Sequence, residues 1–214
     1  MGIKERRERE KAEIRDKILE AARDLFVNEG YESVSMRKIA ERIEYSPTAI
    51  YLHFKDKESV LRELCNTDFL QLAKQLGKIA RIADPVERLR QTGRAYAAFA
   101  VENPNHYRLM FMTPHPPVDL DDGTVEKGNP EEDAYAFLRG ILVDCIEQGR
   151  LRPELTDPEL LAQVMWAGVH GVVSLHIAKC NDDWIDWCPS EQRVELMIDS
   201  LIRGLVREPA GGEA

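Results

Sequence analysis

The amino-acid sequence predicts an all-α protein with a small N-terminal helical domain and a larger C-terminal helical bundle. Apolar side chains recur three or four residues apart along most of the 214 residues, a spacing that places them on one face of a helix. Proline, glycine and capping residues separate these stretches, and no stretch carries a strand signal. The length suits two domains, which we expect to span residues 1–60 and 61–214.

Residues 35–54 have the pattern of two short helices joined by a tight turn. Ser35 can cap the first helix, because its hydroxyl accepts hydrogen bonds from the free amides of the first turn. Ser46 offers a second cap, and Pro47 follows at the first helical position, where no amide hydrogen is needed. The pair shares an apolar inner face made of Met36, Ile39, Ala40, Ile43, Ile50 and Phe54. Such a unit is a helix-turn-helix, and its outer face carries Thr48, Ala49, Tyr51 and His53.

Together with the helix before it, this unit resembles the DNA-binding domain of the tetracycline-repressor (TetR) family of bacterial transcription regulators. The positions that carry the resemblance are Ile18, Ala21, Ala22, Leu25, Phe26, Gly30, Tyr31, Ile39, Ala40, Ser46, Tyr51, His53, Phe54, Lys57 and Glu58. The resemblance is specific over residues 1–60, and beyond them it rests on length and the all-helical pattern. It implies a transcriptional regulator, usually a ligand-responsive repressor that binds a palindromic operator as a homodimer.

One position departs from the family pattern. Glu44 stands in the turn, where the family usually has glycine, and Tyr45 follows where a smaller aliphatic residue is common. A residue other than glycine costs about 1 kcal/mol at a positive φ angle, so the turn is either strained or different in geometry. This departure leaves an alternative function open, a helical ligand-sensing or protein-interaction module without specific DNA binding.

The helix-turn-helix suggests a role for each exposed polar side chain. Tyr45 and Thr48 are placed to meet base edges in the major groove, whereas the resemblance assigns Tyr51, His53 and Lys57 mainly to phosphates. Lys57 begins the next helix, so its ammonium and the first backbone amides can face one phosphate. The full expected DNA-binding set, in which Arg37 serves a guanine or a phosphate, is Ser35, Arg37, Tyr45, Ser46, Thr48, Tyr51, His53 and Lys57. The alternative for each is a solvated surface residue.

The charge distribution is uneven. The chain has a net charge of −9, but residues 1–60 hold 13 basic and 13 acidic side chains, so the remainder carries the whole acidic excess. Repulsion from DNA therefore favours docking by the N-terminal end, with few phosphate contacts. Basic residues between Lys4 and Lys11 could add contacts, although the interleaved Glu5, Glu8 and Glu10 favour a solvated extension of the first helix.

Motifs and composition argue against several other classes. No Gly-rich phosphate loop or nucleophile motif is present. His170 and His176 are six residues apart, on different faces of one helix, and we expect no catalytic residue, no metal site and no cofactor. The stretch 1–11 lacks the apolar run of a signal peptide, and we expect no membrane-spanning stretch. The sequence therefore predicts a cytoplasmic protein with no membrane partner.

The four cysteines, Cys65, Cys145, Cys180 and Cys188, include no Cys-x-x-Cys pair. Neither a zinc site nor a disulfide framework is indicated, and we expect ordinary packing cysteines. Cys180 and Cys188 bracket the predicted turn 181–187, which leaves a redox pair there as an open alternative.

Beyond the helix-turn-helix, the helical pattern continues to the end of the chain. The expected helices span residues 58–76, 85–101, 105–112, 131–150, 157–178 and 190–206. Prolines, glycines and acidic residues fill 113–130, which predicts a mobile loop.

The last two predicted helices have the pattern of a dimerisation surface. One carries small and aliphatic residues on one face, and the other carries a matching apolar stripe. The residues are Val164, Gly168, Gly171, Leu175, Val194, Ile198, Leu201 and Leu205. Two copies would form the four-helix interface that the resemblance implies, with the two helix-turn-helix units about one DNA turn apart. The alternative is that both stripes belong to an internal core.

The C-terminal domain also offers candidates for an effector site. Aromatic side chains with a few polar tips could line an apolar pocket for a small, largely apolar effector. The candidates are Phe69, Tyr96, Phe99, Tyr107, Phe111, Tyr135, Trp166 and His170. The same residues would also suit an ordinary helical core. The segment 166–171, with tryptophan, histidine and glycine close together, is similar to a C-terminal domain type found in part of the TetR family.

Overall fold

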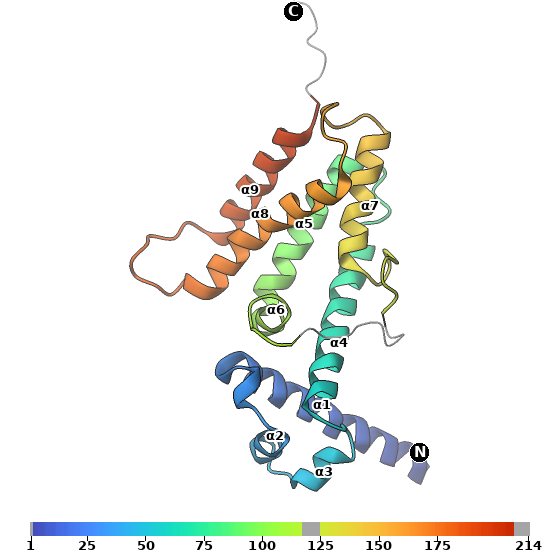
Figure 1. Ribbon diagram of the computed structural model, residues 1–214, viewed down its shortest axis with the longest axis vertical. Coiled ribbons are helices and arrows are strands. Elements are labelled where there is room, and N and C mark those ends of the chain that lie inside the picture. Colours follow the sequence, from blue (N-terminus) through green and yellow to red (C-terminus); the bar gives the residue numbers. More distant parts are fainter. Residues whose placement is uncertain (1, 117–124, 208–214) are drawn as a thin grey trace, which may run out of the picture. The chain divides into compact units, whose positions relative to one another are not determined.

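The computed structural model describes residues 2–116 and 125–207, and the regular structure in these ranges is helical (Figure 1). An isolated bridge pairs Leu151 with Val206. The elements are α1 (Ile3–Glu29), η1 (Tyr31–Ser33), α2 (Met36–Arg42), α3 (Pro47–Tyr51), α4 (Lys57–Gly77), α5 (Pro85–Glu102), α6 (Pro104–Phe111), α7 (Ala134–Glu147), α8 (Pro158–Lys179) and α9 (Ser190–Leu205). The predicted all-α fold is confirmed.

Contacts group the chain into two compact units. The first, called unit 1, comprises Met1–Asp68 and Asn105–Thr124, and the second, called unit 2, comprises Phe69–Pro104 and Val125–Ala214. Helix α4 contributes residues to both. The predicted boundary between residues 60 and 61 stays a prediction. Of the loop expected over 113–130, residues 117–124 lie outside the described residues.

The core of unit 1 forms where α1, α2 and α3 meet. Ile18, Phe26, Ile39 and Ile50 are fully buried there, and so is the small side chain of Ala40. Both predicted caps are present. The Ser35 hydroxyl accepts a hydrogen bond from the Lys38 amide at 3.2 Å, and the Ser46 hydroxyl accepts one from the Ala49 amide at 3.2 Å. The two short helices therefore begin where the sequence predicts.

Glu44 resolves the question about the turn between α2 and α3. Its φ angle is 60°, in the left-handed region. The Tyr45 amide donates to the Ala40 carbonyl at 2.9 Å, and the Glu44 amide donates to the Glu41 carbonyl at 3.2 Å. These two bonds form a Schellman motif, the helix ending in which glycine is preferred at the left-handed position. The turn keeps the ordinary geometry and is strained at Glu44.

A buried ionic cluster joins α1, α4 and α6 within unit 1. Asp68 is fully buried, and the Arg23 guanidinium donates to both of its carboxylate oxygens, one bond being 3.0 Å long. The Nδ1 atom of His106 lies 2.9 Å from the same carboxylate. A buried carboxylate is tolerated only when it is paired and hydrogen-bonded, so each of the three helices depends on the other two at this point.

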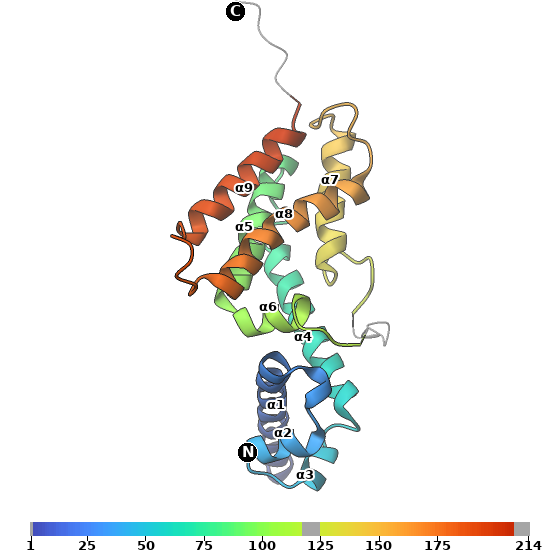
Figure 2. The same cartoon turned by 60° about the vertical axis from the view of Figure 1, so that its left-hand side comes forward.

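Unit 2 is a bundle of α5, α7, α8 and α9 (Figure 2). Helix α8 packs against the other three, and its Leu161, Met165, Val169 and Val173 are buried. Gly168 allows the close approach of α9, because a Cβ atom added there would lie 2.6 Å from Leu201 Cδ1. Gly168, which was predicted to lie in a dimer interface, therefore serves the packing of α8 against α9 within the protomer.

Two expectations about α8 and α9 require correction. By length and composition, helix α8 is apolar enough to cross a membrane, so the expectation that no stretch is was wrong. The physical reason for its apolar composition is that α8 is the central helix of unit 2 and packs against three others. The expected α9 stripe of Val194, Ile198 and Leu205 is buried inside the protomer, because α9 turns this face towards α8 and α5.

The cysteines divide into two classes. Cys65 and Cys145 are buried, and burial raises the pKa of the Cys65 thiol to about 12 and that of Cys145 to about 11. Cys180 and Cys188 are exposed and unbridged. Buried thiols with raised pKa values are chemically inert, as packing cysteines should be.

We expect Glu44→Gly to raise the free energy of unfolding by about 1 kcal/mol, because glycine adopts a positive φ angle without steric cost. The control is Glu41→Gly, one turn earlier in α2, which should lower it by about 1 kcal/mol. Urea unfolding measures both. A loss of stability in both variants would contradict the strained turn.

We expect Asp68→Asn to lower the free energy of unfolding by roughly 3–5 kcal/mol, because it leaves the buried Arg23 charge uncompensated. Glu63→Gln breaks the more exposed pair with Arg15 and should cost less than about 1 kcal/mol. Equal effects of the two variants in the same urea titration would refute a structural role of the buried cluster.

Candidate nucleic-acid interface

Helix α3 presents a mixed polar and apolar face to solvent. Ile50 anchors the helix in the core of unit 1, while Thr48 is exposed and the Tyr51 side chain is 55% exposed. Leu52, which directly follows the helix, is 76% exposed. A capped five-residue helix with one buried anchor can thus offer hydroxyl groups and an apolar side chain to a DNA groove, where thymine methyl groups accept apolar contact.

Leu52 was not among the predicted residues, although the sequence contains a signal for it. Residues four apart share a helix face, and Leu52 is four residues after Thr48. Arg42 and Lys55 were also missed. Both are exposed, and neither has an ion-pair partner among the described residues. Arg42 adds positive charge at the end of α2, beside the turn, and Lys55 adds it shortly after α3.

His53 is held in place through its backbone. The Arg15 guanidinium donates to the His53 carbonyl at 2.7 Å, lies 4.1 Å from the centre of the Phe54 ring and pairs with Glu63. The Nδ1 atom of His53 is buried without a hydrogen-bond partner in the described part of the chain. The half-exposed ring can therefore reach a ligand only through Nε2. Burial, with the charges of Lys11 and Arg15, lowers the pKa of His53.

Lys57 has a different environment from the one the sequence suggests. Its ammonium donates to the Tyr31 carbonyl at 2.7 Å and lies 3.9 Å from the centre of the Tyr31 ring. The first amides of α4 are capped by Asp56, whose carboxylate accepts from the Ser59 amide at 2.8 Å. The start of α4 thus already has an anionic cap, and Lys57 joins α4 to η1.

The remaining predicted DNA-binding residues lie on the same helix-turn-helix, but they differ in exposure and in the partners that they already have. Ser35 and Ser46 are exposed caps, Tyr45 is half-buried, and Arg37 is exposed but pairs with Glu41 at 2.9 Å. A guanidinium already paired with a carboxylate on its own helix must exchange that partner before it binds a phosphate or a base. Thr48, Tyr51 and His53 are free of such competition in the described structure.

The predicted effector-site residues divide between the two units. Tyr107 and Phe111 lie in unit 1, with ring centres 4.9 Å apart, whereas Phe69, Tyr96, Phe99, Tyr135, Trp166 and His170 lie in unit 2. Among residues 2–116 and 125–207, no group of three or more histidine, cysteine or acidic side chains is arranged to hold a metal ion.

Three of the residues in unit 2 form a connected polar group. The Trp166 Nε1 atom donates to the Tyr96 hydroxyl at 2.9 Å, and the Tyr96 oxygen lies 3.3 Å from His170 Nδ1. Since the tyrosine oxygen accepts from the indole, its own proton can bond to Nδ1, which places the proton of a neutral imidazole on Nε2. Burial lowers the pKa of His170, which favours that neutral form.

Comparison with known proteins covers most of the chain. A sequence model described as bacterial regulatory proteins of the tetR family matches residues 18–64, and one described as a tetracyclin repressor-like C-terminal domain matches residues 89–201. The solved structure of the TetR-family regulator PfmR from Thermus thermophilus is 28% identical with a TM-score of 0.68, and the match covers 90% of this chain and 97% of that one. The structure of AibR in complex with isovaleryl coenzyme A and operator DNA is 25% identical with a TM-score of 0.66, covering 88% and 97%.

Curated relatives match over a shorter region. The repressor AcnR of Corynebacterium diphtheriae is 38% identical over 60 residues, which are 28% of this chain and 32% of AcnR. The regulator UidR of Escherichia coli K12 is 34% identical over 73 residues, 34% of each chain. The matched region thus spans about a third of the length of these relatives. The C-terminal family model alone covers more than half of the sequence, so the protein belongs to the tetR family of bacterial regulatory proteins.

Proposed function

We propose that the protein is a cytoplasmic transcriptional repressor that binds a palindromic DNA operator as a homodimer and releases it when a small effector binds. The observation that carries the proposal is the helix-turn-helix itself. Two capped helices and a Schellman turn hold Thr48, Tyr51 and Leu52 on one exposed face. Family membership and the operator complex of AibR support the same reading.

A homodimer requires a surface that remains apolar after the protomer has folded. Helix α8 offers a stripe of exposed apolar side chains, with the half-buried Gly171 between them, and α9 adds one side chain that is 70% exposed. The residues are Leu160, Val164, Gly171, Leu175 and Leu196. Two such faces related by a twofold axis would bring together two copies of the same patch and place two helix-turn-helix units against a palindrome.

The effector site that we propose is centred on the Trp166, Tyr96 and His170 group. Tyr135 adds an aromatic wall, since its ring centre lies 6.3 Å from that of Trp166. Aromatic faces suit an apolar ligand, and the Tyr96 hydroxyl and the imidazole offer the few polar contacts that fix its orientation. A relative of 25% identity, AibR, was solved with isovaleryl coenzyme A, which supports a small branched acyl group as a first candidate.

Release of DNA would then be a population shift. An effector can move the equilibrium only if it binds the non-binding conformation more tightly than the DNA-binding one. The alternative of a helical sensing module without DNA binding is not favoured, because Glu44 leaves the helix-turn-helix geometry intact.

We expect purified protein to select palindromic fragments from genomic DNA, and Tyr51→Ala and His53→Ala to lose them, because each variant removes a predicted phosphate contact from both half-sites. Trp184→Ala is the control, since this tryptophan is 90% exposed in unit 2, and it should select the same fragments. No enrichment by the parent protein at low salt would contradict the proposal.

We expect isovaleryl coenzyme A to weaken operator binding more than coenzyme A does, and Tyr96→Phe to need roughly tenfold more of it, because the variant loses one hydrogen-bonding hydroxyl. Tyr135→Phe is the matched control, as its hydroxyl bonds to the exposed Glu159 instead. Fluorescence anisotropy of labelled operator measures both. Binding of the ligand with unchanged operator affinity would refute the effector mechanism.

A further inference from the structure

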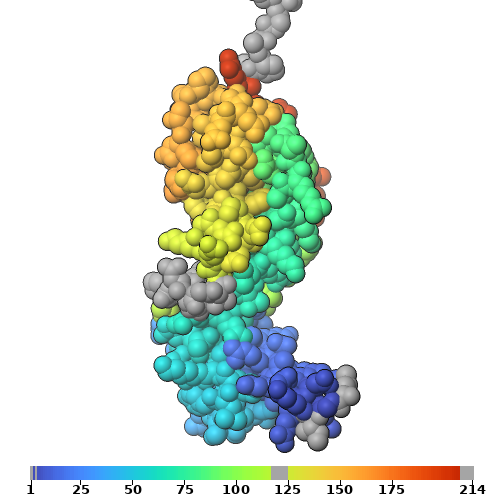
Figure 3. All heavy atoms as spheres, turned by 90° about the vertical axis from the view of Figure 1, so that its right-hand side faces the viewer, coloured from blue at the N-terminus to red at the C-terminus, as the bar shows by residue number. Residues whose placement is uncertain are grey.

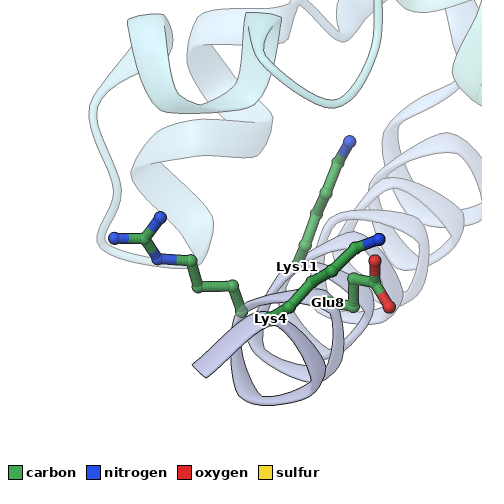
Figure 4. A pocket seen from close by; sticks show the side chains of 4 residues that line it. Lys4, Glu8 and Lys11 are labelled. Atoms are coloured by element: carbon green, nitrogen blue, oxygen red, sulfur yellow. The ribbon is translucent and has the colours of Figure 1, made fainter. Parts of the chain in front are cut away.

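The first turns of α1 border an open cavity in unit 1 that the helix-turn-helix does not include. Its volume is about 420 Å³, and Lys4, Arg7, Glu8 and Lys11 line it (Figure 4). The close-up shows the Lys11 ammonium extending away from the helix, with Lys4 and Glu8 beside it. Residues spaced like these share one helix face, so the cavity has a wall with three positive charges and one negative charge.

The two faces of this part of α1 differ in how their charges are compensated. On the other face Arg6 pairs with Glu10 at 2.8 Å, and Arg9 pairs with Glu13 at 3.7 Å. Among the described residues, the cavity-lining cations have no carboxylate within ion-pair distance. Figure 3 shows these first turns, in dark blue, exposed on the surface of unit 1. Exposed cations that have no carboxylate partner and border a cavity can bind an anion.

The same face of α1 leads directly to the helix-turn-helix. Arg15 is one turn beyond Lys11, and its guanidinium donates to the His53 carbonyl at 2.7 Å. Lys11 is itself near enough to His53 for its charge to help burial lower the pKa of that histidine. The cationic stripe is therefore continuous with the end of α3, where the predicted phosphate contacts Tyr51 and His53 lie.

We propose that Lys4, Arg7 and Lys11 bind backbone phosphates of the operator beyond the segment that α3 contacts, so that α1 lengthens each half-site. This inference rests on the proposed function. From Lys4 to Lys11 the helix rises about 10 Å, and each DNA strand carries one phosphate per 3.4 Å of helix axis. The stripe thus matches about three phosphates. Glu8 faces the same cavity and opposes the contact.

The test compares two double variants that change the net charge equally. Arg7→Ala/Lys11→Ala removes two unpaired cations, and Arg6→Ala/Arg9→Ala removes two paired ones. Operator affinity is measured between 50 and 200 mM salt for the selected palindrome, and each phosphate contact contributes about 0.9 to the slope of log affinity against log salt. Loss of two contacts in each protomer should make the dimer's negative slope shallower by about 3.6 in the first variant and leave it nearly unchanged in the second.

Phosphate ethylation interference gives a second readout. The parent protein should show flanking phosphates whose modification blocks binding, and Arg7→Ala/Lys11→Ala should lose this sensitivity while retaining that of the central phosphates. Thermal melts establish that both variants are folded. Equal slopes for the two variants, with operator binding intact, would overturn the inference and leave the proposed function standing. Absence of operator binding by the parent protein would overturn both.

Discussion

Unit 1 depends on a carboxylate that has no access to water. Asp68 is fully buried and is held by Arg23 of α1 and His106 of α6. An isolated charge in such a place is prohibitively costly, so the residues that neutralise it must stay within hydrogen-bond distance. Helix α1 also packs against α2 of the helix-turn-helix. The position of α6 is therefore linked, through one carboxylate, to the helix on which the DNA-binding elements pack.

The strain at Glu44 arises from local backbone geometry and not from a buried charge. The Schellman hydrogen bonds and the caps at Ser35 and Ser46 determine where α2 ends and α3 begins, and Glu44 adopts the φ angle that this geometry demands. Several weak local contacts thus outweigh the strain of the left-handed backbone at Glu44, which costs about 1 kcal/mol. Strained positions tend to persist at functional sites, where the surroundings determine them.

Local chemistry made the helix-turn-helix predictable. Ser35, Ser46 and Pro47 are signals read over a few residues, and the structure has helices beginning where they predict. The buried cluster around Asp68 was not predictable in this way, because it joins residues 45 and 38 positions apart. The α9 stripe was misassigned for a related reason. Periodicity shows that Val194 and Ile198 share an apolar face, but only packing shows that this face is covered by the protomer's own helices.

The pairing of surface cations with carboxylates of the same chain affects how strongly the protein is attracted to DNA in general. Arg37, Lys38 and Arg15 each have a carboxylate partner, so much of the positive charge near the helix-turn-helix is already compensated before DNA arrives. Sequence-independent attraction to the double helix arises almost entirely from uncompensated cations. Each such carboxylate therefore weakens the attraction to random genomic DNA, and the attraction that remains comes from the cations without a carboxylate partner in the described structure, which include Arg42, Lys55 and the α1 stripe of Lys4, Arg7 and Lys11.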